Sequence, residues 1–112
     1  MANYMLVCVG GIHPSDADEA ARVAQAWGAW FGRLGATVSN PGSPFGPAKT
    51  LAAGGTITDG APCGLTRYTV IAAESLEAAA EIAKDCPHLH SFGSTGVCGT
   101  IEVYEALQVT VP

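Results

Sequence analysis

Residues 65–90 read LTRYTVIAAESLEAAAEIAKDCPHLH, a strand pattern followed by a helix pattern and an abrupt stop. Residues 65–73 are rich in β-branched and aromatic side chains, which predicts a central strand. Ser75 can cap the helix that follows, and Glu77 places negative charge in its first turn. One helical face then carries Leu76, Ala79, Ala80 and Ala83. Pro87 ends the helix because proline disfavours helical geometry in the residue before it.

A second strand and helix precede this stretch. Residues 4–9, YMLVCV, form a short apolar run that ends at two glycines, which is typical of a buried strand. A helix follows, with Ser15 or Asp16 as its cap and Gly35 as its end. Its apolar face carries Ala20, Val23, Trp27, Trp30, Phe31 and Leu34. Gly28 and Gly32 lie inside this helix, either because another backbone comes close or because they are tolerated there.

The middle of the chain is less regular. Residues 36–39 predict a second strand, and residues 40–47 predict a Pro/Gly loop centred on Phe45. Residues 49–51 and 56–58 predict a small hairpin across residues 52–55. Residues 99–107 predict the last strand, with Ile101, Val103 and Glu105 on one face.

The order of these elements predicts the fold class. It is β-α-β-(hairpin)-β-α-β, an α+β pattern of the ferredoxin-like βαββαβ type, in one domain over residues 1–112. Two amphipathic helices would cover one face of an antiparallel sheet. The strands are apolar on both faces, so the second face needs a cover. A second copy of the chain supplies that cover, which predicts a homodimer with sheet facing sheet.

Composition excludes several classes of protein. The chain has 10 acidic and 5 basic residues, a formal charge of −5, and no run of Lys or Arg. It therefore lacks the electrostatic footprint of a nucleic-acid binder and of a protein that docks on anionic membranes. No apolar stretch is long enough for a membrane span, and the first residues do not resemble a signal peptide. We therefore expect a cytoplasmic protein. No phosphate loop or nucleotide fingerprint is present, and no cofactor is predicted.

His88 is the first candidate for a catalytic residue. It follows the helix stop, and imidazole exchanges protons near neutral pH. Asp59 or Asp85 would orient it and raise its basicity. The alternatives are structural: His88 can cap the carbonyls of the helix end, Asp59 can be a turn residue before Gly60, and Asp85 can be a solvated charge.

Four residues are candidates for substrate binding: Arg67, Tyr68, Trp30 and Phe45. Arg67 and Tyr68 are adjacent in a strand, so only one of them can line a given pocket. Arg67 can hold an anionic substrate, or it can pair with Glu102 or Glu105. The aromatic residues can line a pocket, although helical spacing also makes Trp30 a core residue.

A zinc site is the weaker interpretation of the segment after the helix. Cys86, His88, His90 and Cys98 include the ligand types that zinc prefers. Their spacing matches no usual zinc motif, and we predict no metal site. Cys8 lies in an apolar strand and is expected to be buried, and the lack of a secretory signal disfavours disulfides among the four cysteines.

These segments together resemble the YCII-related proteins, in particular the DGPF-type branch. The resemblance is carried by residues 65–79, 85–88 and 99–103, and by the Asp59-Gly60 pair. It implies a dimeric α+β barrel with a pocket between the sheet and the helices. Two departures matter. Residues 59–62 read DGAP, without the signature phenylalanine, and the first helix has no histidine to match the His–Asp pair of plain YCII members.

Two functional hypotheses follow. The first is a cofactor-independent enzyme that does acid–base chemistry on a small polar or aromatic substrate, using His88 with Asp59 or Asp85. The second is a non-catalytic homodimer that binds a small molecule or another protein. The missing first-helix histidine favours the second, and the polar group around His88 favours the first. The sequence leaves open whether the chain is an enzyme.

Overall fold

The computed structural model describes residues 1–10, 17–61, 64–90 and 99–108. Its main sheet has four strands: β1 (Ala2–Val9), β2 (Val38–Pro44), β5 (Leu65–Ala73) and β6 (Thr100–Ala106). The strand order is β2-β5-β1-β6, and each pair of neighbours is antiparallel. The helices are α1 (Ala17–Leu34) and α2 (Leu76–Ala83), with short 3₁₀ turns η1 (Gly35–Thr37) and η2 (Pro87–Leu89). The predicted α+β class with two helices and an antiparallel sheet is confirmed.

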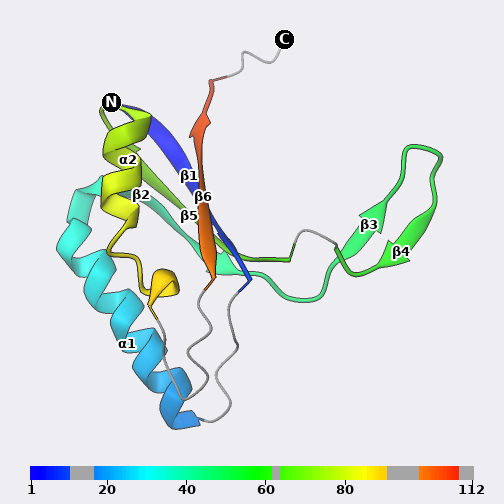
Figure 1. Cartoon of the computed structure of the whole chain (residues 1–112), viewed down its shortest axis with the longest axis horizontal. Helices are drawn as coiled ribbons and strands as arrows, with labels where there is room; N and C mark the ends of the chain where they lie inside the picture. The colour runs from blue at the N-terminus through cyan, green and yellow to red at the C-terminus, as the bar shows by residue number, and fades with distance from the viewer. Residues whose placement is uncertain (11–16, 62–63, 91–98, 109–112) are drawn as a thin grey trace.

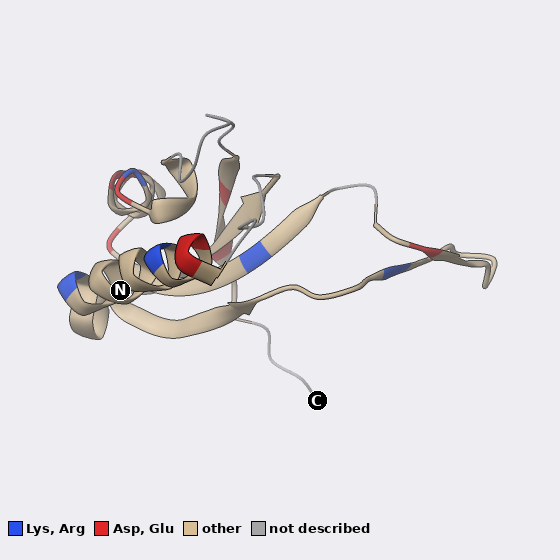
Figure 2. Cartoon of the chain, turned by 90° about the horizontal axis from the view of Figure 1, so that it is seen from below, with Lys and Arg blue, Asp and Glu red and all other residues tan. Residues whose placement is uncertain are grey.

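Both helices cover the same face of the sheet (Figures 1 and 2). Alternate residues of β1, namely Tyr4, Leu6 and Cys8, point toward the helices and are buried. They meet Trp27 and Trp30 from α1 in the core. Ile71 and Ala73 of β5 and Ala79 and Ala83 of α2 complete it. The residues of β1 and β5 that alternate with these therefore face the other side of the sheet.

Residues 65–90 fold in part as their local signals predict. Of the predicted apolar face of α2, Ala79 and Ala83 are buried, whereas Leu76 and Ala80 are exposed, so that part of the prediction is wrong. Strand β5 spans the nine residues 65–73, and it pairs with β1 on one side and β2 on the other. The Ser75 side chain accepts a hydrogen bond from the Ala78 backbone N–H at 3.1 Å and so caps α2. The α-helical part ends at Ala83, and Pro87 opens η2.

Helix α1 also agrees with its pattern and begins directly after residues 11–16, so its predicted caps Ser15 and Asp16 lie outside the described residues. Gly35 follows the helix with a φ of 55°, a left-handed conformation that favours glycine. At Gly28 and Gly32 a Cβ would meet no heavy atom within 4 Å in the described part of the chain. These two glycines are therefore tolerated rather than required by a close backbone.

The predictions for residues 36–39 and 40–47 are wrong in part, because residues 36 and 37 lie in η1 and β2 runs from Val38 through Pro44 instead of ending at residue 39. Strand β2 lies at the edge of the sheet and pairs only with β5. An edge position tolerates proline, and the register shifts on both sides of Asn40 absorb the irregular sequence. The Thr69 hydroxyl donates to the Pro41 carbonyl at 3.0 Å, which attaches β2 to β5 at this irregular point.

The predicted hairpin is present. Strands β3 (Lys49–Leu51) and β4 (Ile57–Asp59) form a separate two-stranded antiparallel sheet. Figure 1 shows this sheet as a green extension that projects away from the main sheet. We call residues 49–59 the arm. Asp59 therefore lies on the arm and not in the layer between the sheet and the helices.

Candidate functional site

Arg67 lies on the helix-covered face of the sheet and packs against aromatic rings. It is paired in register with Cys8 of β1 and points toward α1. Its guanidinium carbon is 4.1 Å from the centroid of the Trp27 ring and 5.8 Å from that of Phe31. A cation above an aromatic face is attracted by the ring quadrupole. The rings therefore hold the guanidinium under α1.

The charge of Arg67 is only partly compensated. The Nε atom is buried and has no hydrogen-bond partner among the described residues. Burial lowers the pKa of Arg67, which still leaves an arginine fully charged at neutral pH. Of the expected carboxylate partners, Glu102 accepts a hydrogen bond from the Tyr104 hydroxyl at 2.7 Å. The two ion pairs seen in the described residues involve Lys49 and Lys84.

We call Arg67, Trp27, Trp30 and Phe31 the cluster. A second hydrogen-bond donor in this cluster is also unpaired. Trp30 is 1% exposed, and its Nε1–H has no partner in the described part of the chain. Its ring lies edge-on to that of Trp27, with centroids 5.7 Å apart. Trp27 therefore contacts both Arg67 and Trp30. The expectation that these tryptophans are core residues is confirmed, and two buried donors without acceptors accompany them.

Two cysteines border this cluster. Cys8 and Cys86 are 2% and 1% exposed, and their thiols are hydrogen-bonded to each other. The hydrogen bond to Cys8 and burial raise the pKa of Cys86, while the hydrogen bond from Cys86 and the charge of Arg67 lower the pKa of Cys8. The hydrogen bond from Cys86 and the guanidinium thus both favour negative charge on Cys8.

His88 lies at the margin of the same region. Its Nε2 is 3.1 Å from the Val9 carbonyl oxygen, and its backbone N–H donates to the Cys86 thiol. A carbonyl can only accept, so Nε2 carries the proton and Nδ1 is the basic nitrogen of the neutral ring. This bond fixes the ring to the end of β1. The predicted role of His88 as a helix cap is not what the ring does here.

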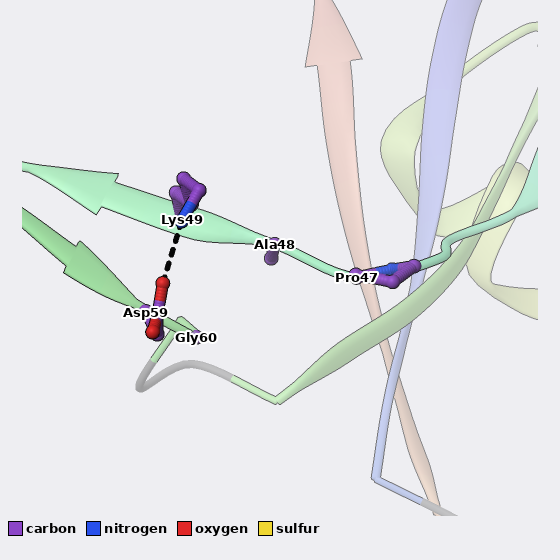
Figure 3. Close-up of a pocket in the computed structure, with 5 residues that line it drawn as sticks. All are labelled: Pro47, Ala48, Lys49, Asp59 and Gly60. Carbon is purple, nitrogen blue, oxygen red and sulfur yellow. Dashed lines mark hydrogen bonds and ion pairs between the residues drawn. The ribbon is translucent and has the colours of Figure 1, made fainter.

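The structure does not bring the predicted acids to His88. The Asp59 carboxylate lies on the arm, is 91% exposed and pairs with Lys49 at 2.6 Å (Figure 3). Asp85 lies instead beside an open surface hollow together with Arg33, Pro87 and His90. No hydrogen bond joins His88 to a carboxylate within the described ranges.

The four predicted binding residues separate into two groups. Arg67 and Trp30 lie between the sheet and α1. Tyr68 lies on the opposite face, where its ring stacks on Phe45 with centroids 5.8 Å apart and an interplanar angle of 16°. Only the first group therefore belongs to the layer beneath the helices.

Comparisons with protein-family models, curated proteins and solved structures give no match for this chain. The resemblance to the YCII-related proteins stays a prediction.

The zinc interpretation gains no support from the described residues. Cys86 is turned toward Cys8, His90 is exposed, and Cys98 lies outside the described residues. Within those residues no group of three His, Cys, Asp or Glu side chains converges.

None of the helices that the structure describes is both long and apolar enough to cross a membrane.

Sequence reasoning named Arg67 and the aromatic residues of α1 separately but did not predict that they meet. The contact between Arg67 and Trp27 depends on the register of β5 against β1 and on the placement of α1. Neither is encoded in the local sequence. The one available signal was periodicity, since Arg67 alternates with Thr69 and Ile71 on the face that is buried. Together the cluster offers a cation and a buried N–H donor beside aromatic rings, and these donors are the groups that interact with a small anion.

Proposed function

We propose that this chain is a small-ligand-binding domain of the YCII-related type, whose ligand is a small carboxylate held at Arg67. One observation carries the proposal: a half-buried guanidinium, stacked on Trp27, whose Nε–H has no acceptor among the described residues. Buried charges are normally paired, because an unpaired charge in a low-dielectric region is unfavourable. A carboxylate would supply the missing counter-charge.

The chemistry of the cluster favours a carboxylate over a neutral ligand. A guanidinium presents a planar set of donors that matches the two oxygens of a carboxylate. The Trp30 Nε1–H is a further donor in the same aromatic group. The rings of Trp27 and Phe31 provide apolar contact for the rest of the ligand. An aromatic or branched aliphatic carboxylate combines these requirements.

Carboxylate binding can be tested by intrinsic tryptophan fluorescence. Its two tryptophans, Trp27 and Trp30, both belong to the cluster, so intrinsic fluorescence reports on it directly. We expect benzoate to change the emission in a saturable way and benzamide, its neutral isostere, to have little effect. Arg67→Met should abolish the response. Arg33→Met is the matched control, because Arg33 is an exposed residue in the last turn of α1. A panel of carboxylates without any saturable change would refute the proposal.

The proposal includes a ferredoxin-like fold and a homodimer. The strand order β2-β5-β1-β6 supports the first, because each helix then connects two strands that are separated by one antiparallel neighbour. The uncovered sheet face supports the second. That face carries Met5, Val9, Tyr68, Val70 and Ala72, which are partly exposed, and Val7, which is already buried in the single chain. A second copy would bury the partly exposed residues sheet to sheet. The cytoplasmic location stays a prediction from the sequence.

An acid–base enzyme is the second candidate, and the position of His88 favours it. The ring is anchored by the Val9 carbonyl, and Val9 follows Cys8, the register partner of Arg67. A ligand held at Arg67 would therefore lie near a histidine with a defined basic nitrogen. If a bound carboxylate is turned over, His88→Ala should abolish turnover and leave the fold intact. Unchanged turnover in this variant would remove His88 from the mechanism.

A further inference from the structure

Two buried thiols meet beside Arg67, and the proposed carboxylate site makes no use of them. Cys8 lies on β1, and Cys86 lies between α2 and η2. Neither forms a disulfide, and their side chains are 2% and 1% exposed in the same core. The two thiols are hydrogen-bonded to each other. Segments that are distant in the chain therefore bring two sulfur atoms into contact.

The sheet also gives Cys8 a cation as its cross-strand neighbour. Cys8 and Arg67 are register partners in the antiparallel pair of β1 and β5, so their side chains leave the sheet side by side on the helix-covered face. The hydrogen bond from Cys86 and the charge of Arg67 lower the pKa of Cys8, and burial opposes them. A cation beside a thiol is a usual source of a reactive thiolate.

Cys86 differs from Cys8 in its surroundings. The hydrogen bond to Cys8 and burial raise the pKa of Cys86, although the His88 backbone N–H donates to its sulfur. Cys8 is therefore the thiol with the greater thiolate character, and Cys86 is a neutral thiol in contact with it. This is the arrangement of an attacking thiol and a resolving thiol.

Core packing alone does not account for this arrangement. A buried cysteine that only fills space behaves as a small apolar side chain. Such a role needs neither a second thiol in hydrogen-bond contact nor an arginine as the register partner. Both are present at Cys8.

We infer that Cys8 and Cys86 are a redox pair, which hydrogen peroxide oxidises to a disulfide. The Cys8 thiolate attacks one peroxide oxygen, so an S–O bond forms and the O–O bond breaks. The hydroxide that leaves takes up the proton that Cys8 lost. The Cys86 sulfur then attacks the sulfenic sulfur of Cys8, the S–S bond forms, and the S–O bond breaks. The second hydroxide takes the Cys86 proton. Each sulfur loses one electron, each peroxide oxygen gains one, and two water molecules are released.

Burial restricts the oxidant to a small molecule. Both sulfur atoms are almost fully covered, so an oxidant reaches them during local opening of the core. Hydrogen peroxide is among the smallest two-electron oxidants. The disulfide would join β1 to the segment that follows α2, and closure of such a long loop constrains the unfolded chain.

The test uses the full chain, whose four cysteines provide an internal comparison. The reduced protein is treated with hydrogen peroxide at neutral pH, the remaining thiols are alkylated, and the peptides are identified by mass spectrometry. We expect a disulfide between Cys8 and Cys86 that dithiothreitol reverses, and the same product in Cys63→Ser with Cys98→Ser. Oxidation of Cys63 and Cys98 with Cys8 and Cys86 left as free thiols would overturn the inference. The same preference for the Cys8–Cys86 link in concentrated urea would also overturn it, because the fold would not be its cause.

Variants in the Cys63→Ser, Cys98→Ser background test the two roles. Cys86→Ala should stop at the Cys8 sulfenic acid, which dimedone traps, and Cys8→Ala should form the trapped product at least about tenfold more slowly. Equal trapping in both variants would overturn the assignment of Cys8 as the attacking thiol. Circular dichroism confirms that each variant is folded.

The role of the cation is tested without changing either cysteine. Arg67→Met should slow disulfide formation at least about fivefold, because it removes the charge that favours the Cys8 thiolate. Arg33→Met is the matched control for loss of one positive charge and should change the rate less than about twofold. Equal rates in these two variants would overturn the activation of Cys8 by Arg67. This readout is independent of the proposed carboxylate binding, which can fail while the disulfide still forms.

Discussion

Replacing Arg67 with methionine should stabilise the unliganded protein while removing its ligand binding. Two terms oppose each other. Removal of the buried, unpaired Nε–H relieves a desolvation penalty of about 2 kcal/mol, within the usual range of about 1–3 kcal/mol. Loss of the contact with Trp27 at 4.1 Å removes a cation–π attraction of about 1 kcal/mol. Methionine retains apolar contact with the rings. The expected net change is a gain of about 1 kcal/mol in the free energy of unfolding.

Urea unfolding measures this change. Far-UV circular dichroism reports the whole fold, and fluorescence reports the cluster, because both tryptophans lie in it. Arg33→Met serves as the control for loss of one positive charge, and it should alter the free energy of unfolding by less than about 0.5 kcal/mol, as exposed substitutions usually do. A loss of more than about 2 kcal/mol in Arg67→Met would mean that Arg67 is a paired structural cation, and the ligand argument would fail with it.

Two glycine substitutions test the backbone in opposite directions. Gly28→Ala should raise the free energy of unfolding by about 1 kcal/mol, since the position is an exposed helix interior where a Cβ meets nothing within 4 Å among the described atoms. A decrease in the free energy of unfolding, measured in urea, would indicate that another surface covers this part of α1. Gly42→Ala should lower the free energy of unfolding by at least about 2 kcal/mol. Gly42 has a φ of 68°, and its Cβ would collide with the Tyr68 backbone carbonyl. A near-neutral Gly42→Ala would show that β2 is not held against β5 at this point.

The parts of the fold that the sequence predicted well are those set by neighbours in the chain. Ser75 caps α2 through a side-chain bond to a residue three positions later. The spacing of apolar residues in α1 determines which side of the helix is buried, and this spacing is visible without any tertiary information. The alternation in residues 65–73 has the same local origin. The cap of α2, the existence of β5 and the buried side of α1 therefore followed from short-range chemistry.

Strand β2 shows where this reasoning stops. Pro41 and Gly42 oppose a central strand, and they led to a predicted loop. They are compatible with an edge strand, and only the strand order reveals that β2 is one. The expected pairing of His88 with Asp59 has a similar origin. Asp59 precedes β5 by few residues, yet it ends a strand of the arm, and the arm directs it away from the helices.

Strand β5 explains why the ligand site and the proposed dimer surface can be adjacent in sequence and separate in space. Arg67 faces the helices and Tyr68 faces the open side, because neighbouring strand residues alternate. Hydrogen bonds to β1 and β2 hold β5 on both edges, so neither side chain can exchange its face for the other. A ligand at Arg67 and a second copy at Tyr68 would then contact opposite faces of the same rigid strand. That rigidity holds the guanidinium in place without a carboxylate from the described residues, which is what a preorganised anion site requires.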